Sequence, residues 1–381
     1  MKNNNSNIIQ SKTFFVELFD EAASLKLDNG DELTSIQVAH QTYGQLNNEG
    51  TNAIVVCHAL TGNAHAAGTL TNEESDSSSN PDLLKKYSKM FLGKPGWWDS
   101  VIGPGKVFDT NKYFVICSNI LGSCYGTTGP VSVDLKSGKP YQAYFPAVTV
   151  RDMVRVQKEL MTYLGVNKIK TVVGGSLGGM QALEWVVMYP EMVESIIPIG
   201  TSAKHSAWAI GLGEVERLAI KNDPDWNNGF YAKQPIKGLS LARQIAMITY
   251  RSQPSFEEKF GREIVDEKEV FQVNSYLDYQ GKKLVERFDA NTYLLLADVM
   301  DRHDLGYNRD KIENVLGAIK AKTLAIGISS DILYPTEEQK FIAKNIPSAK
   351  YAEINSRHGH DAFLIEFEQL EKIIGEFLHK F

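Results

Sequence analysis

Val172-Val173-Gly174-Gly175-Ser176-Leu177-Gly178-Gly179 is the stretch that decides the fold of this 381-residue chain. It contains the pattern G-x-S-x-G, follows the apolar run that begins at Ile169, and precedes the helical pattern Met180–Tyr189. A serine on a sharp strand-to-helix turn forms a nucleophile elbow, and glycines flank it because side chains would collide with neighbouring backbone. The alternative interpretation is a glycine-rich turn with a capping serine.

Four further short apolar runs have the composition of strands buried on both faces, as in a parallel sheet: Ala53–Cys57, Tyr113–Cys117, Ser195–Ile199 and Thr323–Ile328. Helical patterns fall between or after the strands, at Val150–Leu164, Met180–Tyr189, Glu337–Asn345 and Ala362–Leu378. This alternation predicts a mostly parallel, doubly wound α/β sheet. Phe14–Leu18 and Leu33–His40 are expected to form an antiparallel hairpin at the edge of the sheet.

Residues 201–319 differ from the rest of the chain, because strand-like runs are scarce and several stretches are amphipathic. They predict a helical insertion between two strands. We therefore expect residues 1–200 and 320–381 to form the core domain, and residues 201–319 to form a lid over the site.

A serine hydroxyl is a weak nucleophile at neutral pH and needs a base that an acid orients. In the α/β-hydrolase fold, which is typical of this elbow, the chain order is serine, acid, histidine. Asp331 follows the run Thr323–Ile328 and is the candidate acid, although an aspartate there is also a common turn former. His358 and His360 both precede the last helical pattern, and spacing does not choose between them.

The oxyanion of an acyl-transfer intermediate needs backbone N–H donors. One is expected from Leu177, directly after the nucleophile, and the second from the loop after an earlier strand. That loop is His58-Ala59-Leu60-Thr61-Gly62, in which Leu60 is the predicted donor.

Several long motifs, in order along almost the whole chain, resemble the homoserine O-acetyltransferase family. They are CHALTG (Cys57–Gly62), PGWWD (Pro95–Asp99), GGSLGGMQALEW (Gly174–Trp185), ARQIAMITYRS (Ala242–Ser252), SSDILYP (Ser329–Pro335) and GHDAFLIE (Gly359–Glu366). The resemblance implies transfer of the acetyl group of acetyl-CoA to the hydroxyl of L-homoserine by a ping-pong acyl-serine mechanism, a step toward methionine.

The same resemblance assigns the individual residues. It makes His360 the catalytic base and supports Asp331 as the acid. It gives Arg243 and Tyr250 to homoserine binding, and Asp361 to the substrate amino group. The spacing agrees in part, because Arg243 and Tyr250 are seven residues apart and share one helix face. Leu241, Ile245 and Ile248 are expected to pack on the opposite face.

Other activities compete with this one. The same fold could use succinyl-CoA as donor or L-serine as acceptor, and a plain esterase needs only the triad. Arg243 and Asp361 disfavour the esterase, because hydrolysis of a simple ester does not require a grip on amino-acid charges. A non-catalytic binding module is a third alternative, which would have to keep an intact triad without using it.

The composition and net charge of the chain disfavour several classes of binding partner. A net charge of −6 disfavours nucleic acid, whose binding depends on neutralising phosphates. Three cysteines form no metal signature or disulfide framework. The start of the chain lacks the apolar core of a signal peptide, and no run approaches the roughly 20 residues that span a bilayer. We expect a cytoplasmic protein with no membrane partner, metal or permanently bound cofactor, and acetyl-CoA as co-substrate. The resemblance implies a homodimer formed through the insertion.

Overall fold

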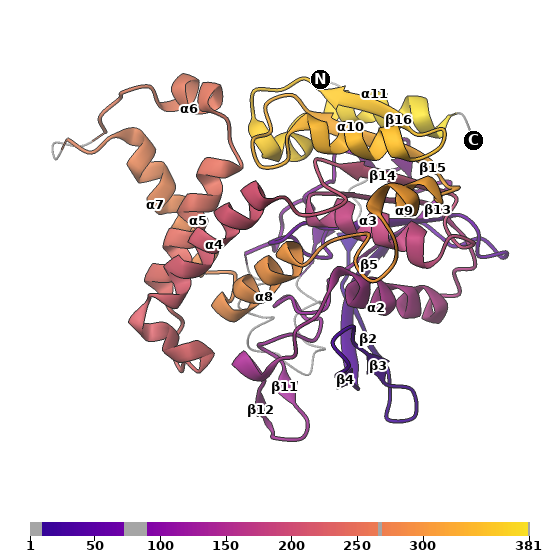
Figure 1. Ribbon diagram of the computed structural model, residues 1–381, viewed down its shortest axis with the longest axis horizontal. Helices are drawn as coiled ribbons and strands as arrows, with labels where there is room; N and C mark the ends of the chain where they lie inside the picture. Colours follow the sequence, from indigo (N-terminus) through magenta and orange to yellow (C-terminus); the bar gives the residue numbers. More distant parts are fainter. Residues whose placement is uncertain (1–9, 72–89, 266–268, 380–381) are drawn as a thin grey trace.

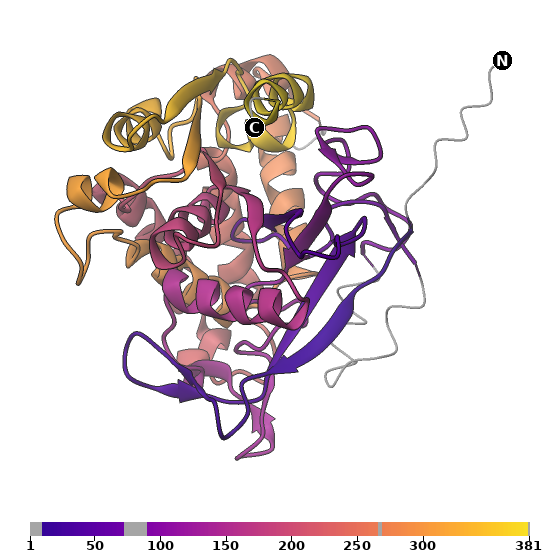
Figure 2. The same cartoon turned by 90° about the vertical axis from the view of Figure 1, so that its right-hand side faces the viewer.

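An eight-stranded sheet lies at the centre of the computed structural model, which describes residues 10–71, 90–265 and 269–379 (Figure 1). From one edge to the other its strands are β16 (Lys350–Ile354), β15 (Lys322–Ile328), β14 (Ser195–Ile199), β13 (Ile169–Gly175), β6 (Ala53–Cys57), β10 (Phe114–Ser118), β5 (Ile36–Tyr43) and β2 (Phe14–Leu18). Neighbours are parallel from β16 to β10, whereas β5 is antiparallel to both β10 and β2. The C-terminal strand therefore lies at one edge and the N-terminal strand at the other (Figures 1 and 2).

Two-residue strands form small pairs outside this sheet. They are β1 (Gln10–Ser11) with β7 (Thr69–Leu70), β3 (Leu25–Lys26) with β4 (Glu32–Leu33), β8 (Ile102–Gly103) with β9 (Phe108–Asp109), and β11 (Val133–Asp134) with β12 (Lys139–Pro140). A short 3₁₀ turn, η2 (Gln142–Tyr144), follows the last of them.

Helices cover both faces of the sheet. All five residues of β6 are buried, with Val55 and Cys57 in one apolar cluster and Ile54 and Val56 in the other. The first cluster includes residues of α2 (Val150–Tyr163), α3 (Leu177–Met188) and α10 (Thr336–Asn345), and the second those of α11 (Phe367–Leu378). Side chains alternate between faces along a strand, so a strand covered on both sides is apolar throughout. The predicted doubly wound α/β core is confirmed.

The predicted antiparallel pair at the sheet edge is also confirmed, but the second strand spans Ile36–Tyr43 instead of Leu33–His40. Phe14 pairs with His40 and Leu18 pairs with Ile36. The second strand runs to Tyr43 rather than ending at His40, because its C-terminal half also pairs with β10, where Tyr43 lies opposite Val115.

The predicted C-terminal helix begins later than expected. A 3₁₀ turn, η4 (Gly359–Leu364), precedes α11, and Ile365 and Glu366 leave helical geometry between them. The sequence pattern from Ala362 onward merged these two elements because both are rich in apolar residues. His360 and Asp361 lie in this 3₁₀ turn, which contacts β15.

Between the neighbouring strands β14 and β15 the chain is helical. The elements are α4 (Ala207–Lys221), η3 (Pro224–Gly229), α5 (Ile236–Thr249), α6 (Gln253–Phe260), α7 (Gln272–Val285), α8 (Ala290–Asp301) and α9 (Ile312–Gly317). Helices α4, α5 and α7 pack together and extend to one side of the core, and α8 lies between them and the core (Figure 1). No helix among the residues that the structure describes is long and apolar enough to cross a membrane.

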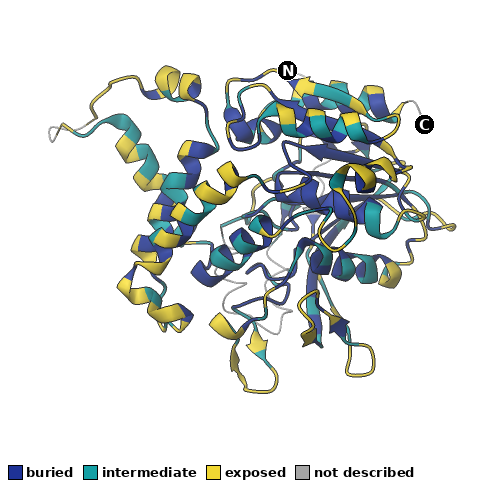
Figure 3. Cartoon of the chain, viewed as in Figure 1, coloured by how far each residue is buried: buried dark blue, intermediate teal, exposed yellow. Residues whose placement is uncertain are grey.

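The predicted packing face of α5 is wrong. Leu241 and Ile248 are 49% and 52% exposed and Ile245 is half-buried, whereas the buried side of the helix includes Leu239, Ala242, Ala246 and Met247. The reason is close packing on two sides: a Cβ atom at Gly281 of α7 would lie 2.2 Å from the Oγ of Ser240. Small residues allow this close approach of the two helices, and α5 keeps both buried and exposed positions along its length (Figure 3).

Candidate active site

Ser176 stands on a strained turn between β13 and α3. Its φ of 58° and ψ of −126° lie outside the ordinary regions for a side-chain-bearing residue, as a nucleophile elbow requires. The turn is tightly enclosed, because a Cβ atom at Gly178 would lie 2.1 Å from the carbonyl oxygen of Cys57. Within the described part of the chain the Ser176 Oγ makes no hydrogen bond, and Ser176 lines a cavity of about 400 Å³.

His360 and Asp331 form a buried pair on the same side of the sheet. The Nδ1 atom of His360 donates to the Oδ2 atom of Asp331 at 2.6 Å. The other oxygen of Asp331 accepts the backbone N–H groups of Leu333 and Tyr334, at 2.9 and 3.0 Å. Because these contacts fix the carboxylate, they also fix the plane and tautomer of the histidine ring, and leave its Nε2 to accept a proton.

Two opposing effects set the pKa of His360. Burial alone lowers it, but the charge and hydrogen bond of Asp331 outweigh burial, so the pKa of His360 is raised above its ordinary value. His358, the alternative base, is only half-buried and lines a different cavity beside Arg251 and Phe256. The structure therefore pairs Asp331 with His360 and not with His358.

His58 holds the loop that contains Leu60. Its Nε2 accepts the backbone N–H of Ile120 at 3.2 Å, so Nδ1 carries the proton and donates to the carbonyl oxygen of Ala59 at 2.8 Å. Burial lowers the pKa of His58 to about 4, which keeps the ring neutral near pH 7. His58 therefore has a structural role in this loop. Leu60 lines the cavity with Ser176, and Leu177 is buried directly behind it.

Gln181 ties the two predicted oxyanion segments together, and the sequence patterns did not single it out. Its Nε2 donates to the carbonyl oxygens of His58 and Leu177, at 3.2 and 3.1 Å. Its Oε1 accepts from Gln157 at 2.7 Å, so the amide orientation is fixed from both ends. The sequence signal that could have identified Gln181 is a glutamine four residues into a buried helix, on the face toward the preceding loop.

The predicted amino-acid-binding residues reach the same cavity from the insertion and from η4. Arg243, Tyr250 and Asp361 all line it together with Ser176 and His360. The guanidinium of Arg243 lies 5.5 Å from the ring centre of Tyr250. Asp361 is held by its backbone N–H, which donates to the carbonyl of Tyr250 at 3.2 Å, and by Arg251, whose Nε lies 3.3 Å from Oδ2. A cation and an anion thus stand on the wall of a cavity that also contains the serine.

Three further cations line this cavity and were not predicted as site residues: Lys94, Lys283 and Arg287. Arg287 donates from Nη1 to the carbonyl of Thr61 at 2.9 Å and to the hydroxyl of Tyr125 at 2.5 Å. No spacing rule relates Lys94, in a loop of the core, to a helix of the insertion, so sequence patterns alone could not join them.

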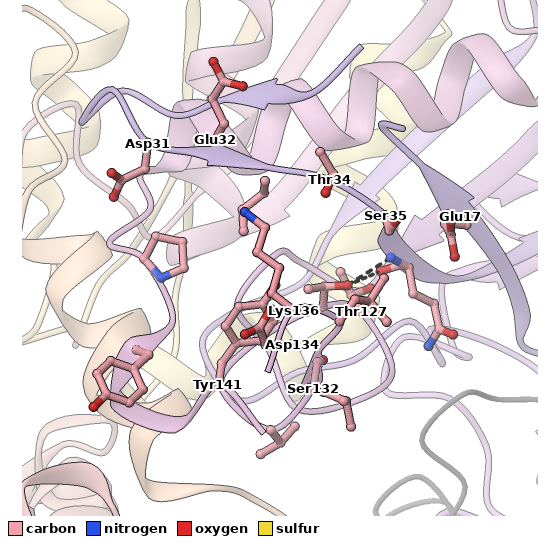
Figure 4. A pocket seen from close by; sticks show the side chains of 18 of the residues that line it. Glu17, Asp31, Glu32, Thr34, Ser35, Thr127, Ser132, Asp134, Lys136 and Tyr141 are labelled. Carbon is pink, nitrogen blue, oxygen red and sulfur yellow. Dashed lines mark hydrogen bonds between the residues drawn. The ribbon is translucent and has the colours of Figure 1, made fainter. Parts of the chain in front are cut away.

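A larger cavity, of about 600 Å³, lies elsewhere, between residues 31–37 and the segment 124–146 (Figure 4). Glu17, Asp31, Glu32, Asp134 and Lys136 are among its lining residues, and none of the predicted site residues lines it. The described residues contain no group of three or more His, Cys, Asp or Glu side chains that could hold a metal ion. We place the candidate active site in the smaller cavity, because the elbow serine and the buried histidine meet there.

Comparison with known proteins agrees with this placement. A family model described as the α/β-hydrolase fold matches residues 52–366. A homoserine O-acetyltransferase from Moorella thermoacetica is 48% identical over 372 residues, which cover 94% of this chain and 95% of that protein. The chain belongs to the homoserine O-acetyltransferase family. Another member of this family, from Deferribacter desulfuricans, is 47% identical over 392 residues, or 100% of this chain and 98% of that protein.

Solved structures place the homoserine O-acetyltransferase family beside esterases. The crystal structure of a homoserine O-acetyltransferase from Bacillus anthracis matches with a TM-score of 0.85 and 30% identity, covering 97% of this chain and 98% of that one. Esterase E22 matches with a TM-score of 0.84 and 28% identity, covering 97% and 100%. The predicted fold and the family resemblance are therefore confirmed.

Proposed function

We propose that this chain transfers the acetyl group of acetyl-CoA to the side-chain hydroxyl of L-homoserine, and releases O-acetyl-L-homoserine and CoA. One observation carries the proposal. A single cavity is lined by a nucleophile-elbow serine, the buried His360, and two side chains of opposite charge, Arg243 and Asp361. The first pair suits acyl transfer and the second suits an amino acid. The names of the family members, at 44–48% identity, support the same reaction.

In the first half-reaction Ser176 is acylated. His360 Nε2 takes the proton of the Ser176 hydroxyl as its oxygen attacks the thioester carbonyl carbon. The tetrahedral intermediate collapses, the carbon–sulfur bond breaks, and His360 returns the proton to the leaving CoA sulfur. CoA thiol leaves an acetyl ester on Ser176. Asp331 stabilises the positive charge that His360 carries between these two steps.

In the second half-reaction homoserine accepts the acetyl group. Its side-chain hydroxyl gives its proton to His360 and attacks the acetyl carbonyl, and the Ser176 oxygen leaves and takes the proton back. The negative oxygen of both intermediates is stabilised by the N–H groups of Leu60 and Leu177. Gln181 and His58 support this by fixing the two segments from which those N–H groups project.

Homoserine is oriented by its two charged groups. A guanidinium binds a carboxylate through paired N–H donors, so Arg243 suits the α-carboxylate. Asp361 suits the α-ammonium, and its contact with Arg251 holds the carboxylate in place before the substrate arrives. Tyr250, packed between Arg243 and the His360 ring, closes the wall between the binding groups and the base.

The reaction uses no resident cofactor. Ser176 supplies the nucleophile, His360 moves the proton, and acetyl-CoA enters and leaves as CoA in each cycle. We expect the reaction to take place in the cytoplasm, where acyl-CoA thioesters are available. Succinyl-CoA as donor and L-serine as acceptor are the nearest alternatives, since both need the same triad and the same charged contacts.

Ester hydrolysis is the second candidate function, because esterase E22 has the same fold at 28% identity. Water and homoserine are both oxygen nucleophiles, and the triad does not distinguish them. The charged pair Arg243 and Asp361 favours the transferase, because a hydrolase gains nothing from binding an amino acid's carboxylate and ammonium.

A homodimer formed through the insertion is also part of the proposal. The large apolar side chains Val215 and Leu218 of α4, and Leu241 and Ile248 of α5, are exposed. Exposed apolar residues gathered on neighbouring helices are typical of a surface that another protein covers. A second copy of this chain would bury them.

The test is to mix the protein with acetyl-CoA, with and without L-homoserine, and to follow CoA thiol and O-acetylhomoserine together. Thiol release that depends on homoserine, matches the ester formed and disappears in Ser176→Ala supports the transferase. Thiol release that is indifferent to homoserine supports the hydrolase. Parallel reactions with succinyl-CoA and L-serine decide the donor and the acceptor.

A further inference from the structure

The cavity of the proposed active site contains more positive charge than the proposed use of homoserine explains. Among the residues that the structure describes, four cationic side chains line it, Lys94, Arg243, Lys283 and Arg287, against one carboxylate, Asp361. That carboxylate already has Arg251 beside it. The chain as a whole is acidic, with a net charge of −6, so the excess is local. Homoserine brings one carboxylate, which Arg243 suffices to bind.

The three remaining cations lack a carboxylate partner within the described part of the chain. Among the residues that the structure describes, Lys94, Lys283 and Arg287 form no ion pair with a carboxylate. The other cations lie close enough to act on Lys283. Partial burial lowers the pKa of its ammonium, and the charges of Arg287, Lys94 and Arg243 lower it further. Like charges that converge without a counter-ion destabilise the free protein, and a bound anion would relieve that repulsion.

The exposure of the lining residues increases from the inner end of the cavity to its mouth. Ser176 and His360 are buried, Arg287 is half-buried, and Lys94 and Lys283 are exposed. Arg287 is anchored to the loop of Leu60 through the carbonyl of Thr61 and keeps further N–H donors, since a guanidinium has five. The reactive serine thus lies at the inner end of the cavity and the lysines at its mouth.

We propose that Lys94, Lys283 and Arg287 bind the phosphate groups of the acyl-CoA donor at the mouth of the cavity. This assignment rests on the proposed function, which requires a thioester at Ser176. CoA carries its phosphates at the end of the molecule opposite to the thioester. A donor whose thioester reaches the buried serine therefore has its phosphates nearer the surface, where the two lysines stand. Lys94 belongs to the core and Lys283 to α7, so bound phosphates would also join the insertion to the core.

The test compares two donors, one with and one without the nucleotide that carries the phosphates. Acetyl-CoA and S-acetylpantetheine share the thioester and the pantetheine arm, but the second lacks the nucleotide and all phosphates. In Lys94→Gln and Lys283→Gln the KM for acetyl-CoA should rise about threefold to fivefold each, and roughly tenfold or more in the double variant. The KM for homoserine, and kcat/KM with S-acetylpantetheine, should stay within about twofold of wild type.

Lys282→Gln is the matched control. Lys282 is the neighbour of Lys283 on the same helix, is exposed and pairs with Asp278, so it removes the same charge away from the cavity. Equal losses with both donors, or no change with acetyl-CoA in the double variant, would overturn the proposal. So would an equal effect of Lys282→Gln.

If homoserine is not the acceptor, the experiment gives a different result. Wild-type protein that releases CoA thiol from acetyl-CoA but makes no O-acetylhomoserine contradicts the proposed function, and the thiol assay still compares the lysine variants. If acetyl-CoA does not react at all, calorimetric titration with CoA and with pantetheine measures the same difference. Tighter binding of CoA in wild type, lost in the double variant, supports the phosphate site, and equal binding of the two ligands overturns it.

Discussion

The Nδ1 atom of His360 lies 2.6 Å from the Oδ2 atom of Asp331, and both side chains are buried. The other carboxylate oxygen is held by two backbone N–H groups, so the pair has one geometry. We predict that Asp331→Asn lowers kcat by roughly a thousandfold to ten-thousandfold, because the amide favours the wrong tautomer of His360. Steady-state transfer kinetics measure this, with circular dichroism to show an intact fold. A loss below about tenfold would remove Asp331 from the mechanism.

The rate should depend on pH through the same pair. A base must be unprotonated, and the pKa of His360 is raised above 6.5 because Asp331 outweighs burial. We therefore expect kcat/KM to be low in acid and to rise as the pH increases through a pKa above 6.5. The raised pKa also stabilises the fold below pH 6.5, and this contribution is lost as the pH rises through the folded-state pKa. A pH–rate profile of wild type and Asp331→Asn tests the assignment: the acidic limb should move to lower pH in the variant, since the main cause that raises the pKa of His360 is lost while burial, which lowers it, remains. An unmoved limb would assign it to another group.

Gln181 should control the oxyanion site without touching substrate. Gln181→Met keeps the volume but removes the donor to the carbonyls of His58 and Leu177. We expect a loss of about 1–3 kcal/mol in the free energy of unfolding and at least a tenfold fall in kcat, with little change in either KM.

Gln157→Met is the control for this prediction. It loses the contacts with Gln181 and Trp185 but none with the two backbone carbonyls. Denaturant unfolding should show a comparable destabilisation, whereas kcat should stay close to wild type. If both variants lose kcat equally, the effect of Gln181 is general loosening of the core.

Arg243 should act on the acceptor and not on the donor. Arg243→Ala leaves the carboxylate of homoserine without its partner, so the KM for homoserine should rise by about thirtyfold or more. The initial burst of CoA thiol, which reports acylation of Ser176, should persist. Lys237→Ala, an exposed cation on the same helix, serves as the control. A variant that loses the burst and keeps its homoserine KM would place Arg243 on the donor side.

The outward-facing residues of α5 should govern association. Leu241→Asp together with Ile248→Asp puts two charges on a surface that we expect a second copy to bury. Light scattering should report a dimer for wild type and a monomer for the double variant. Tyr163→Asp, at the exposed end of α2, should leave the mass unchanged. A monomeric wild type, or a dimer that survives the two charges, would contradict this surface.

Sequence patterns that each lie within one short segment predicted the parallel strands of the core well. Each predicted parallel strand coincides with an observed one to within two residues, because a strand buried on both faces has an unbroken apolar run. The packing face of α5 was predicted wrongly, because the sequence of a helix does not by itself fix which of its faces is buried. Burial of a helix face depends on which helices pack against it, and α4 and α7 both contact α5 through small residues. Leu241 and Ile248 are left exposed, whereas Leu239 and Met247 are buried.

The sequence by itself determined the strand–turn–helix around Ser176, the order of serine, acid and histidine along the chain, and the family. These are local patterns, or long motifs that can be recognised without knowledge of the fold. The tertiary structure decided which histidine meets Asp331, how Gln181 links the loop of His58 to α3, and that Lys94 and Lys283 share one cavity. Those relations join residues far apart in the chain. The order of the strands brings His360 to Asp331 and the loop of His58 to α3, and the packing of the insertion against the core brings Lys283 to the cavity that Lys94 lines.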